Sequence, residues 1–195
     1  LLMATKKKLD AIEGKIYAQS LSFDELAKLA QKQENLLACI PAIQPVSNKD
    51  LKRIASGFGY RIHPIYKTRK MHKGLDFSAP KGTPIFSTGD GVVTNSKKVG
   101  GRGYGKYVVI EHGYGYETLY GHMSKVNVRL GQKVKRGDII GYVGNTGSST
   151  APHLHYEVIK NGRKINPINF FYNDLTPEEY EEMINLASQE NQSFD

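Results

Sequence analysis

Short apolar segments separated by glycine-rich turns run from about residue 52 to residue 172, and this pattern constrains the fold more than any other feature. The segments that read as strands are 92–94, 106–110, 118–120, 139–143 and 155–159. Each is short, rich in β-branched or aromatic residues, and close to a glycine. Many short strands with frequent turns are typical of an antiparallel sandwich or a partly closed barrel. We therefore predict a mostly β fold.

The first part of the chain has a helical pattern instead. Apolar residues recur at helical spacing from residue 5 to about residue 39, among Lys, Glu and Gln. Ser22 and Glu25 fit a capping box, which predicts two helical stretches, either a hairpin or a bent helix. A region of this kind more often packs or self-associates than serves as a dedicated partner-binding helix.

The last part of the chain carries two further local signals. Asn161-Gly162 predicts a two-residue hairpin, because both turn positions need positive φ. Thr176, Pro177 and Glu179 predict the start of a C-terminal helix. The predicted organisation is an N-terminal helical region and linker at 1–48, a β domain at 49–173, and a C-terminal helix and tail at 174–195.

Composition limits the function only broadly. The net charge of +8 favours polyanions, but the basic clusters lack regular aromatic interleaving, so we expect solvated surface and no nucleic-acid partner. Cys39 is the only cysteine, which excludes an intramolecular disulfide. No apolar run reaches the roughly 18 residues that span a bilayer. The chain begins with Leu1, so an upstream signal or membrane anchor is compatible with the sequence.

Two short segments carry the candidate metal donors. If each segment is extended, His72 and Asp76 lie on one face, and so do His153 and His155. Gly74, between the first two, leaves space for an ion. Imidazole and carboxylate donors suit zinc, and three protein ligands leave a position open for water or substrate. Spacing alone does not tell which histidines bind the ion, and both segments also fit strands with polar outward faces.

The remaining histidines divide by their surroundings. His122 is the further polar candidate, since an imidazole with a pKa near 6.5 suits proton transfer. The chain has no His-Glu-x-x-His pattern, so the general base would also be an imidazole. His63, before Pro64, and His112, at a strand end, fit structural roles.

Ordered motifs across residues 53–172 resemble the lysostaphin or LytM-type zinc metallopeptidases, which cut peptidoglycan peptides. The matching segments are Ser56–Pro64, His72–Phe77, Pro80–Ile85, Gly89–Val93, Tyr120–Met123, Gly131–Gly137, Gly144–Gly147 and His153–Glu157. Ala151 and Asn166 depart from the family pattern, where glycine and aspartate are common. Neither departure removes a candidate ligand.

The resemblance implies the duplicated hybrid motif fold and a zinc (Zn2+) endopeptidase of the bacterial cell envelope, in the periplasm or outside the cell. It assigns the zinc ligands to His72, Asp76 and His155, and it makes His122 and His153 the catalytic pair. In some relatives a tyrosine shortly before the first ligand stabilises the tetrahedral intermediate. The corresponding candidate in this sequence is Tyr66.

Other functions remain open beside the endopeptidase. Some proteins with this fold have lost their metal ligands and activate other wall hydrolases, and a latent form, covered by the N-terminal region, is a related alternative. The presence of all ligands and both catalytic histidines favours the enzyme. A polyanion-binding β domain rests on charge alone. The motifs do not distinguish glycine bridges, D-alanyl cross-links and stem peptides as substrates.

Overall fold

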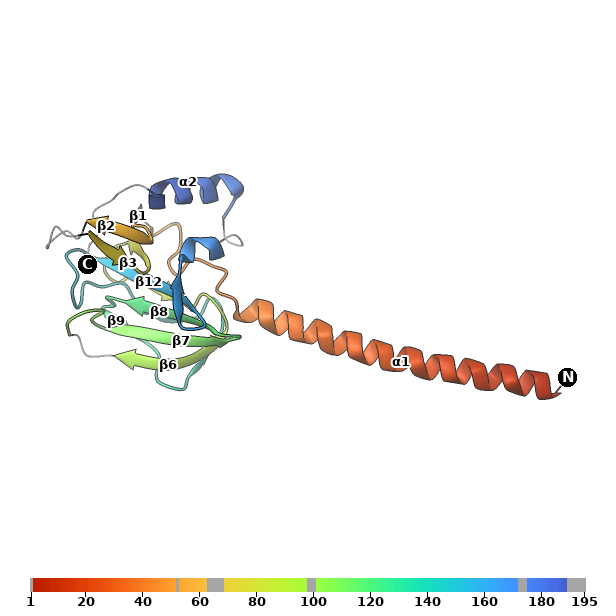
Figure 1. The fold of residues 1–195 in the computed structure, drawn as a ribbon. Coiled ribbons are helices and arrows are strands. Elements are labelled where there is room, and N and C mark those ends of the chain that lie inside the picture. Colours follow the sequence, from red (N-terminus) through yellow and green to blue (C-terminus); the bar gives the residue numbers. More distant parts are fainter. Residues whose placement is uncertain (1, 52, 63–68, 98–100, 172–174, 189–195) are drawn as a thin grey trace. The chain divides into compact units, whose positions relative to one another are not determined.

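The computed structural model describes residues 2–51, 53–62, 69–97, 101–171 and 175–188. The chain divides into two compact units, residues 1–37 and residues 38–195. The first unit is helical, and every strand among the described residues belongs to the second (Figure 1).

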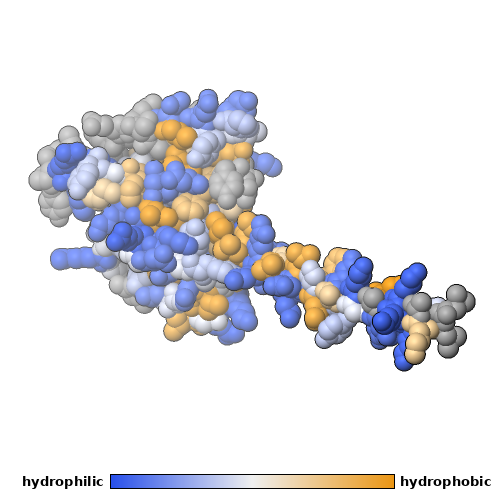
Figure 2. All heavy atoms as spheres, turned by 45° about the vertical axis from the view of Figure 1, so that its right-hand side comes forward, coloured by the Kyte–Doolittle hydropathy of each residue, from blue (hydrophilic) through white to orange (hydrophobic). Residues whose placement is uncertain are grey.

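Helix α1 (Leu2–Cys39) is continuous, so the prediction of two helical stretches is wrong. The helix contains no proline and a single glycine, Gly14, so nothing in the sequence ends it near Ser22. Its large apolar side chains are exposed, among them Leu9, Ile16 and Leu26, and apolar side chains are visible along its surface (Figure 2). No described helix is long and apolar enough to cross a membrane.

The second unit is built on one large antiparallel sheet. Its strands, in spatial order, are β1 (Arg53–Ser56), β4 (Leu75–Ser78), β12 (His153–Lys160), β8 (Tyr116–Gly121), β7 (Tyr107–Gly113), β6 (Gly91–Lys97) and β10 (Lys133–Val134), with β13 (Arg163–Ile165) paired to β12. The prediction of a mostly β, antiparallel fold is confirmed. The described strands do not close into a barrel.

Two smaller sheets accompany the large one. One consists of β5 (Pro84–Phe86), β11 (Ile139–Tyr142) and β9 (Lys125–Val126), and the other is the pair β2 (Gly59–Ile62) and β3 (Arg69–His72). Ile85 and Ile140 of the three-stranded sheet belong to the same buried cluster as Ile110 and Leu154 of the large sheet. These two sheets therefore share one hydrophobic core, as in a sandwich.

Strand β12 explains how the core and a polar site share one sheet. Along an extended strand successive side chains point to opposite faces. Leu154, Tyr156 and Val158 join the hydrophobic cluster, whereas His153 and His155 alternate with them. Both sets are buried, so this strand has a covered polar face as well as a core face.

The local signals near the C-terminal end behave as predicted. Asn161 and Gly162 have φ values of 49° and 75° and connect β12 to β13. Thr176 caps helix α2 (Pro177–Ser188): the Glu179 backbone N–H donates to its hydroxyl over 3.2 Å, and its own backbone N–H donates to the Glu179 carboxylate over 2.8 Å. A short 3-10 helix, η1 (Pro167–Phe170), begins after Asn166, whose side chain accepts from the Ile168 backbone N–H.

The segment predicted as a linker packs within the second unit. Val46 is fully buried and Ala42 nearly so. The Ala42 backbone N–H donates to the Thr88 carbonyl over 3.0 Å, and Pro45 accepts from the Phe86 backbone N–H over 2.9 Å. The division of the chain at residues 48 and 173 stays a prediction.

Candidate metal centre

Three elements bring the predicted donors together. Asp76 on β4 lies opposite His155 on β12 in the antiparallel register, and His72 is the last residue of β3. The premise that residues 72–76 form one extended segment is wrong, because the chain leaves β3 at Lys73 and enters β4 in a different sheet. The predicted proximity of His72 and Asp76 nevertheless holds, through a bend between two strands.

The donor atoms of these three residues form a tight triangle. Nε2 of His72 lies 3.1 Å from Oδ1 of Asp76 and 3.1 Å from Nδ1 of His155. The Nδ1 atom of His155 lies 2.8 Å from the same Asp76 oxygen. Donors bound to zinc at about 2.0–2.1 Å in a tetrahedron lie roughly 3.3 Å apart. The three donors therefore fit one small ion, and among the described residues they form the one such His, Cys, Asp and Glu cluster.

Gly74 contributes in a different way from the one predicted. A Cβ at this position would collide with the backbone oxygen of Tyr156 and would lie 3.0 Å from Cε1 of the His155 ring. The space that glycine leaves is thus filled by strand β12. This close approach lets His155 reach the donors on the other side of the bend.

Hydrogen bonds fix the orientation of both ligand rings. Nδ1 of His72 donates to the Gly57 carbonyl over 2.7 Å, which leaves the lone pair on Nε2. Nε2 of His155 donates to the Glu157 carboxylate over 3.1 Å, which leaves the lone pair on Nδ1. The two atoms left with lone pairs are the two that meet at Asp76. Such outer contacts fix the tautomer and raise the basicity of metal-binding histidines.

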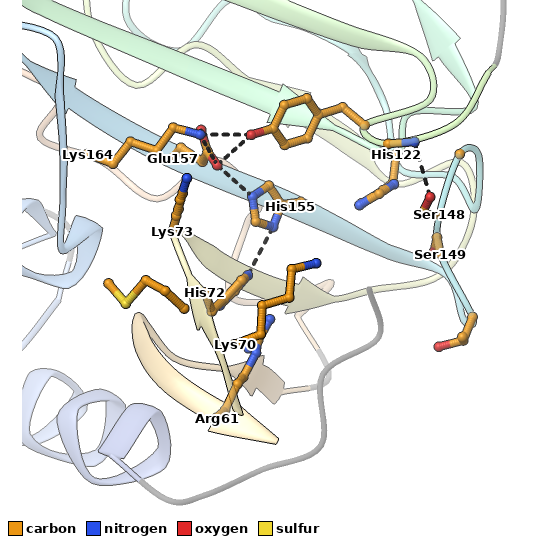
Figure 3. Close-up of a pocket in the computed structure, with 15 residues that line it drawn as sticks. Arg61, Lys70, His72, Lys73, His122, Ser148, Ser149, His155, Glu157 and Lys164 are labelled. Carbon is orange, nitrogen blue, oxygen red and sulfur yellow. Dashed lines mark hydrogen bonds and ion pairs between the residues drawn. The ribbon is translucent and has the colours of Figure 1, made fainter. Parts of the chain in front are cut away.

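Glu157 is itself held by two further side chains (Figure 3). Lys164 Nζ lies 2.7 Å from its Oε2 atom, and the Tyr104 hydroxyl donates to its Oε1 atom over 2.8 Å. Burial raises the pKa of this carboxyl, but His155 and Lys164 outweigh burial and lower the pKa. The Tyr104 ring also stacks on His155, with centroids 5.6 Å apart. Glu157 is therefore an ionised acceptor for the His155 ring.

Asp76 is fully buried and ionised. Burial raises the pKa of its carboxyl, but the His72 and His155 rings in their protonated form outweigh burial, through charge and hydrogen bonds, and hold the pKa well below its usual range. Its second oxygen, Oδ2, lies 3.4 Å from a guanidinium nitrogen of Arg61. A buried carboxylate with these partners is an anionic donor for a metal ion.

His122 and His153 lie beside this cluster as a second pair. Their ring centroids are 4.7 Å apart, and Nε2 of His153 lies 3.9 Å from Oδ1 of Asp76. Nδ1 of His122 donates to the Thr146 carbonyl over 2.7 Å, and Nδ1 of His153 donates to the Ala151 carbonyl over 2.8 Å. The departure from glycine at Ala151 therefore does not prevent this carbonyl from orienting His153.

The backbone at His122 is unusual. Its φ is 57°, in the left-handed region that few non-glycine residues occupy. The conformation is held by the bonds from the His122 and Met123 backbone N–H groups to the carbonyls of Tyr104 and Lys106. Strained residues of this kind cluster at functional sites, because the surroundings must hold them in place.

The other candidates from the sequence lie elsewhere. Tyr66 and His63 fall outside the described residues. His112 is buried between two partners: the Asp90 carbonyl, 2.8 Å from its Nδ1, and the Thr118 hydroxyl, 2.7 Å from its Nε2. Burial lowers the pKa of His112 to about 4. These contacts support a structural role for His112.

The cluster opens into a pocket of about 590 Å³. His72, His122 and His155 line it, together with residues that the sequence did not single out: Arg61, Lys73, Tyr104, Thr150 and Lys164. Glu157 could have been found from its spacing, two residues beyond His155 on one strand. Tyr104 and the orienting carbonyls gave no comparable signal.

Comparison with known proteins identifies the family. The family model described as Peptidase family M23 matches residues 70–167, half of the chain, and the match includes every candidate metal ligand. The chain belongs to peptidase family M23. The predicted resemblance is thereby confirmed.

M23 relatives of known name support the same assignment. The chain is 50% identical over 117 residues to the DD-carboxypeptidase/endopeptidase Mpg of Neisseria meningitidis, which covers 60% of this chain and 26% of that protein. A zinc containing peptidase from Vibrio cholerae matches with a TM-score of 0.59 and 41% identity, over 65% of this chain and 39% of the other. The catalytic domain of lysostaphin from Staphylococcus simulans matches with a TM-score of 0.52 and 34% identity, over 60% of this chain and 91% of the other. The chain thus spans about a quarter of the length of the curated relative.

Proposed function

We propose that this M23 chain is a zinc endopeptidase that hydrolyses peptide bonds in peptidoglycan stems or cross-links. The observation that carries the proposal is the buried triangle of donor atoms on His72, Asp76 and His155, with each ring turned by an outer hydrogen bond. The names of the relatives support a metal-dependent peptidase acting on D,D-peptide bonds. Its place of action would be the cell envelope, where peptidoglycan lies.

The donor set suits zinc because two imidazoles and one carboxylate leave a fourth position open. When bound, zinc supplies a water of lowered pKa and polarises the scissile carbonyl. His72, Asp76 and His155 would hold the ion through the three donor atoms of the buried triangle.

His122 and His153 then act on protons. In each neutral ring the Nδ1–H group donates a hydrogen bond to a backbone carbonyl, so the lone pair on Nε2 is available to accept a proton. His153 Nε2 lies 3.9 Å from Asp76, at the edge of the metal cluster, where it can take a proton from the attacking water. His153 can then return this proton to the leaving amine. His122, which follows β8 beside the start of β12, can in its protonated form donate a hydrogen bond from Nε2 to the developing oxyanion. Tyr66 is proposed to assist at the oxyanion.

The direct test uses peptidoglycans with different cross-links. Purified sacculi are incubated with the zinc-loaded chain, and new termini are identified by mass spectrometry. Chelated protein and His122→Ala are the controls. Cleavage that survives both controls would contradict the proposed mechanism. Unchanged peptidoglycan with zinc bound would instead favour a latent form or an activator of other wall hydrolases.

Helix α1 supports a further part of the proposal, self-association with a second copy. Six of its exposed apolar residues fit the a and d positions of one heptad register, in which Gln19, Ala30 and Gln33 occupy the intervening positions: Leu9, Ile12, Ile16, Phe23, Leu26 and Leu37. This heptad pattern is typical of a coiled-coil seam. Light scattering should show a dimer that Ile16→Lys with Leu26→Lys converts to a monomer, while Lys7→Gln, outside the seam, leaves the dimer intact. A monomer in the unsubstituted chain would exclude self-association.

A membrane anchor upstream of residue 1 is also proposed, and detergent-dependent extraction of the full-length protein tests it.

A further inference from the structure

One wall of the pocket is basic. In the β2–β3 pair, Arg61 and Lys70 lie directly opposite each other, and both line the pocket. Lys70 is two residues before His72 on the same strand, so both side chains are on the face toward the metal cluster. Lys73 and Lys164 add two more cations to the lining. Figure 3 shows Arg61, Lys70 and Lys73 around His72.

Only half of this positive charge is neutralised within the described part of the pocket. Arg61 lies 3.4 Å from Asp76, and Lys164 lies 2.7 Å from Glu157. Lys70 and Lys73 are exposed, and neither makes an ion pair or hydrogen bond with a described residue. Glu157 is the one acidic residue among the described residues that line the pocket, and Lys164 already occupies it.

The cations of the β2–β3 pair repel each other, and a bound anion would offset this repulsion. Like charges directly opposite each other in an antiparallel pair destabilise it, and Arg61 faces Lys70 in this way. The facing wall offers the hydroxyls of Ser148, Ser149 and Thr150, which are neutral. The positive excess is therefore confined to the β2–β3 side of the pocket. A bound metal ion would increase it.

We propose that Lys70 and Lys73 bind a free carboxylate of the substrate next to the scissile bond. The substrate class is then an anionic stem peptide rather than a neutral glycine bridge. The inference rests on the proposed peptidase function, since it assigns the substrate of the same site. The carboxylate comes either from the C-terminus of the peptide or from a side chain, and the two sources share one recognition chemistry.

The test uses three synthetic cross-linked peptides that differ in one group. One has free carboxylates throughout, one has its side-chain carboxylates amidated, and one has its C-terminus amidated. For the unsubstituted chain, kcat/KM should fall roughly ten- to a hundredfold on amidation of the recognised group, as expected for the loss of one charged hydrogen bond, mainly through KM. The amidated peptide that is affected identifies the source of the carboxylate.

The variants then attribute this preference to the two lysines. Lys70→Gln with Lys73→Gln should reduce the ratio of kcat/KM for free over amidated peptide to about one, and the corresponding double Arg variant should restore it. Lys81→Gln, an exposed lysine outside the pocket lining, is the matched control and should keep the ratio. Equal cleavage of all three peptides by the unsubstituted chain, or an unchanged ratio in the double Gln variant, would overturn the inference.

A binding measurement keeps this test separate from the proposed activity. The zinc-loaded His122→Ala variant is titrated calorimetrically with the free and amidated peptides. Tighter binding of the free peptide that disappears with Lys70→Gln and Lys73→Gln would support the subsite even if no peptide were cut. Equal binding of all peptides would overturn it, whereas absence of cleavage alone would count against the peptidase.

Discussion

The two groups of histidines at the site are held by different parts of the fold. His72 and His155 lie on strands and converge on buried Asp76, with donor atoms 2.8–3.1 Å apart. His122 and His153 stand beside them with ring centroids 4.7 Å apart. The first pair is oriented partly by a charged side chain, Glu157. In the second pair, His122 donates to the Thr146 carbonyl, and His153 Nδ1 lies near the Ala151 carbonyl and the neutral Ser149 hydroxyl.

This difference separates two properties of the site. In the His72–Asp76–His155 cluster, the buried carboxylate and the two imidazoles stabilise one another. Removing one of these residues should therefore reduce both metal affinity and the free energy of unfolding. The His122–His153 pair adds little to those contacts, so its loss should affect turnover and leave the metal in place. Substitutions in the two groups therefore test whether binding and proton transfer are carried by separate residues.

The largest effect is expected from His155→Ala. The substitution removes one metal donor and leaves the buried Asp76 carboxylate without its 2.8 Å partner. Breaking a buried charged contact on one side typically costs about 3–5 kcal/mol. We expect loss of zinc by mass spectrometry of the metal, hydrolysis at background level, and a lower melting temperature. Chelation should abolish hydrolysis by the unsubstituted chain, and zinc should restore it there but not in the variant. Full zinc occupancy in His155→Ala would contradict the ligand assignment.

The next effect is expected from His122→Ala and His153→Ala, each made separately. Removing a general acid or base typically lowers the rate about 10²- to 10⁴-fold. We expect kcat to fall in this range while zinc content stays at one ion per chain. Comparing His153→Ala with His155→Ala is the sharpest test, because the two residues lie on one strand face. Loss of zinc from His153→Ala would move this residue into the metal cluster.

The sequence predicted which residues lie together better than it predicted their geometry. The alternation along residues 153–158 placed both histidines on one face, and the structure agrees. The alternation could not show which of the two histidines lies next to Asp76. Their positions depend on β4, which is nearly eighty residues away in the sequence and pairs Asp76 with His155. Register between distant segments leaves no local pattern. Only the resemblance to the lysostaphin-type family distinguished the two histidines.

Other features were ambiguous or absent in the sequence. The capping-box pattern at Ser22 did not begin a helix, because its residues are also tolerated inside one when no proline interrupts the chain. The carbonyls of Gly57 and Thr146, which orient two imidazoles, carry no sequence signature, since every residue has a carbonyl. Lys70 belongs to a basic cluster expected to be solvated surface, and the structure places it at the pocket.

A smaller effect on metal binding is expected from Glu157→Gln. The variant keeps the shape of the side chain but removes the negative charge of the carboxylate that accepts a hydrogen bond from His155 Nε2. Loss of such an outer partner typically weakens metal affinity about 10- to 100-fold. Competition with a chromogenic chelator measures the zinc dissociation constant. Glu111→Gln, at an exposed position of β7, is the matched control. Equal affinity in both variants would mean that Glu157 does not support His155.

Substitution of His112, which belongs to neither group, is expected to have the smallest effect on the site. It should instead change how the stability of the fold depends on pH. Its pKa in the folded chain is about 4, because burial disfavours the charged ring, whereas an unfolded histidine titrates near 6.5. Between these values the unfolded chain binds more protons, so this contribution to stability is fully present above pH 6.5 and is lost as the pH falls toward 4. The full difference corresponds to about 3 kcal/mol, of which about 2 kcal/mol is lost by pH 5.

His112→Gln isolates this contribution, because glutamine offers a donor and an acceptor to Asp90 and Thr118 without titrating. Urea unfolding of the zinc-free proteins at pH 7 and pH 5 gives the two free energies of unfolding, and metal-linked protons are then absent from both. The unsubstituted chain should lose about 2 kcal/mol more than the variant on acidification. Parallel losses would show that His112 does not enter the fold as a buried neutral ring. Peptide hydrolysis at neutral pH by the zinc-loaded variant should stay close to that of the unsubstituted chain, which separates this histidine from His122 and His153.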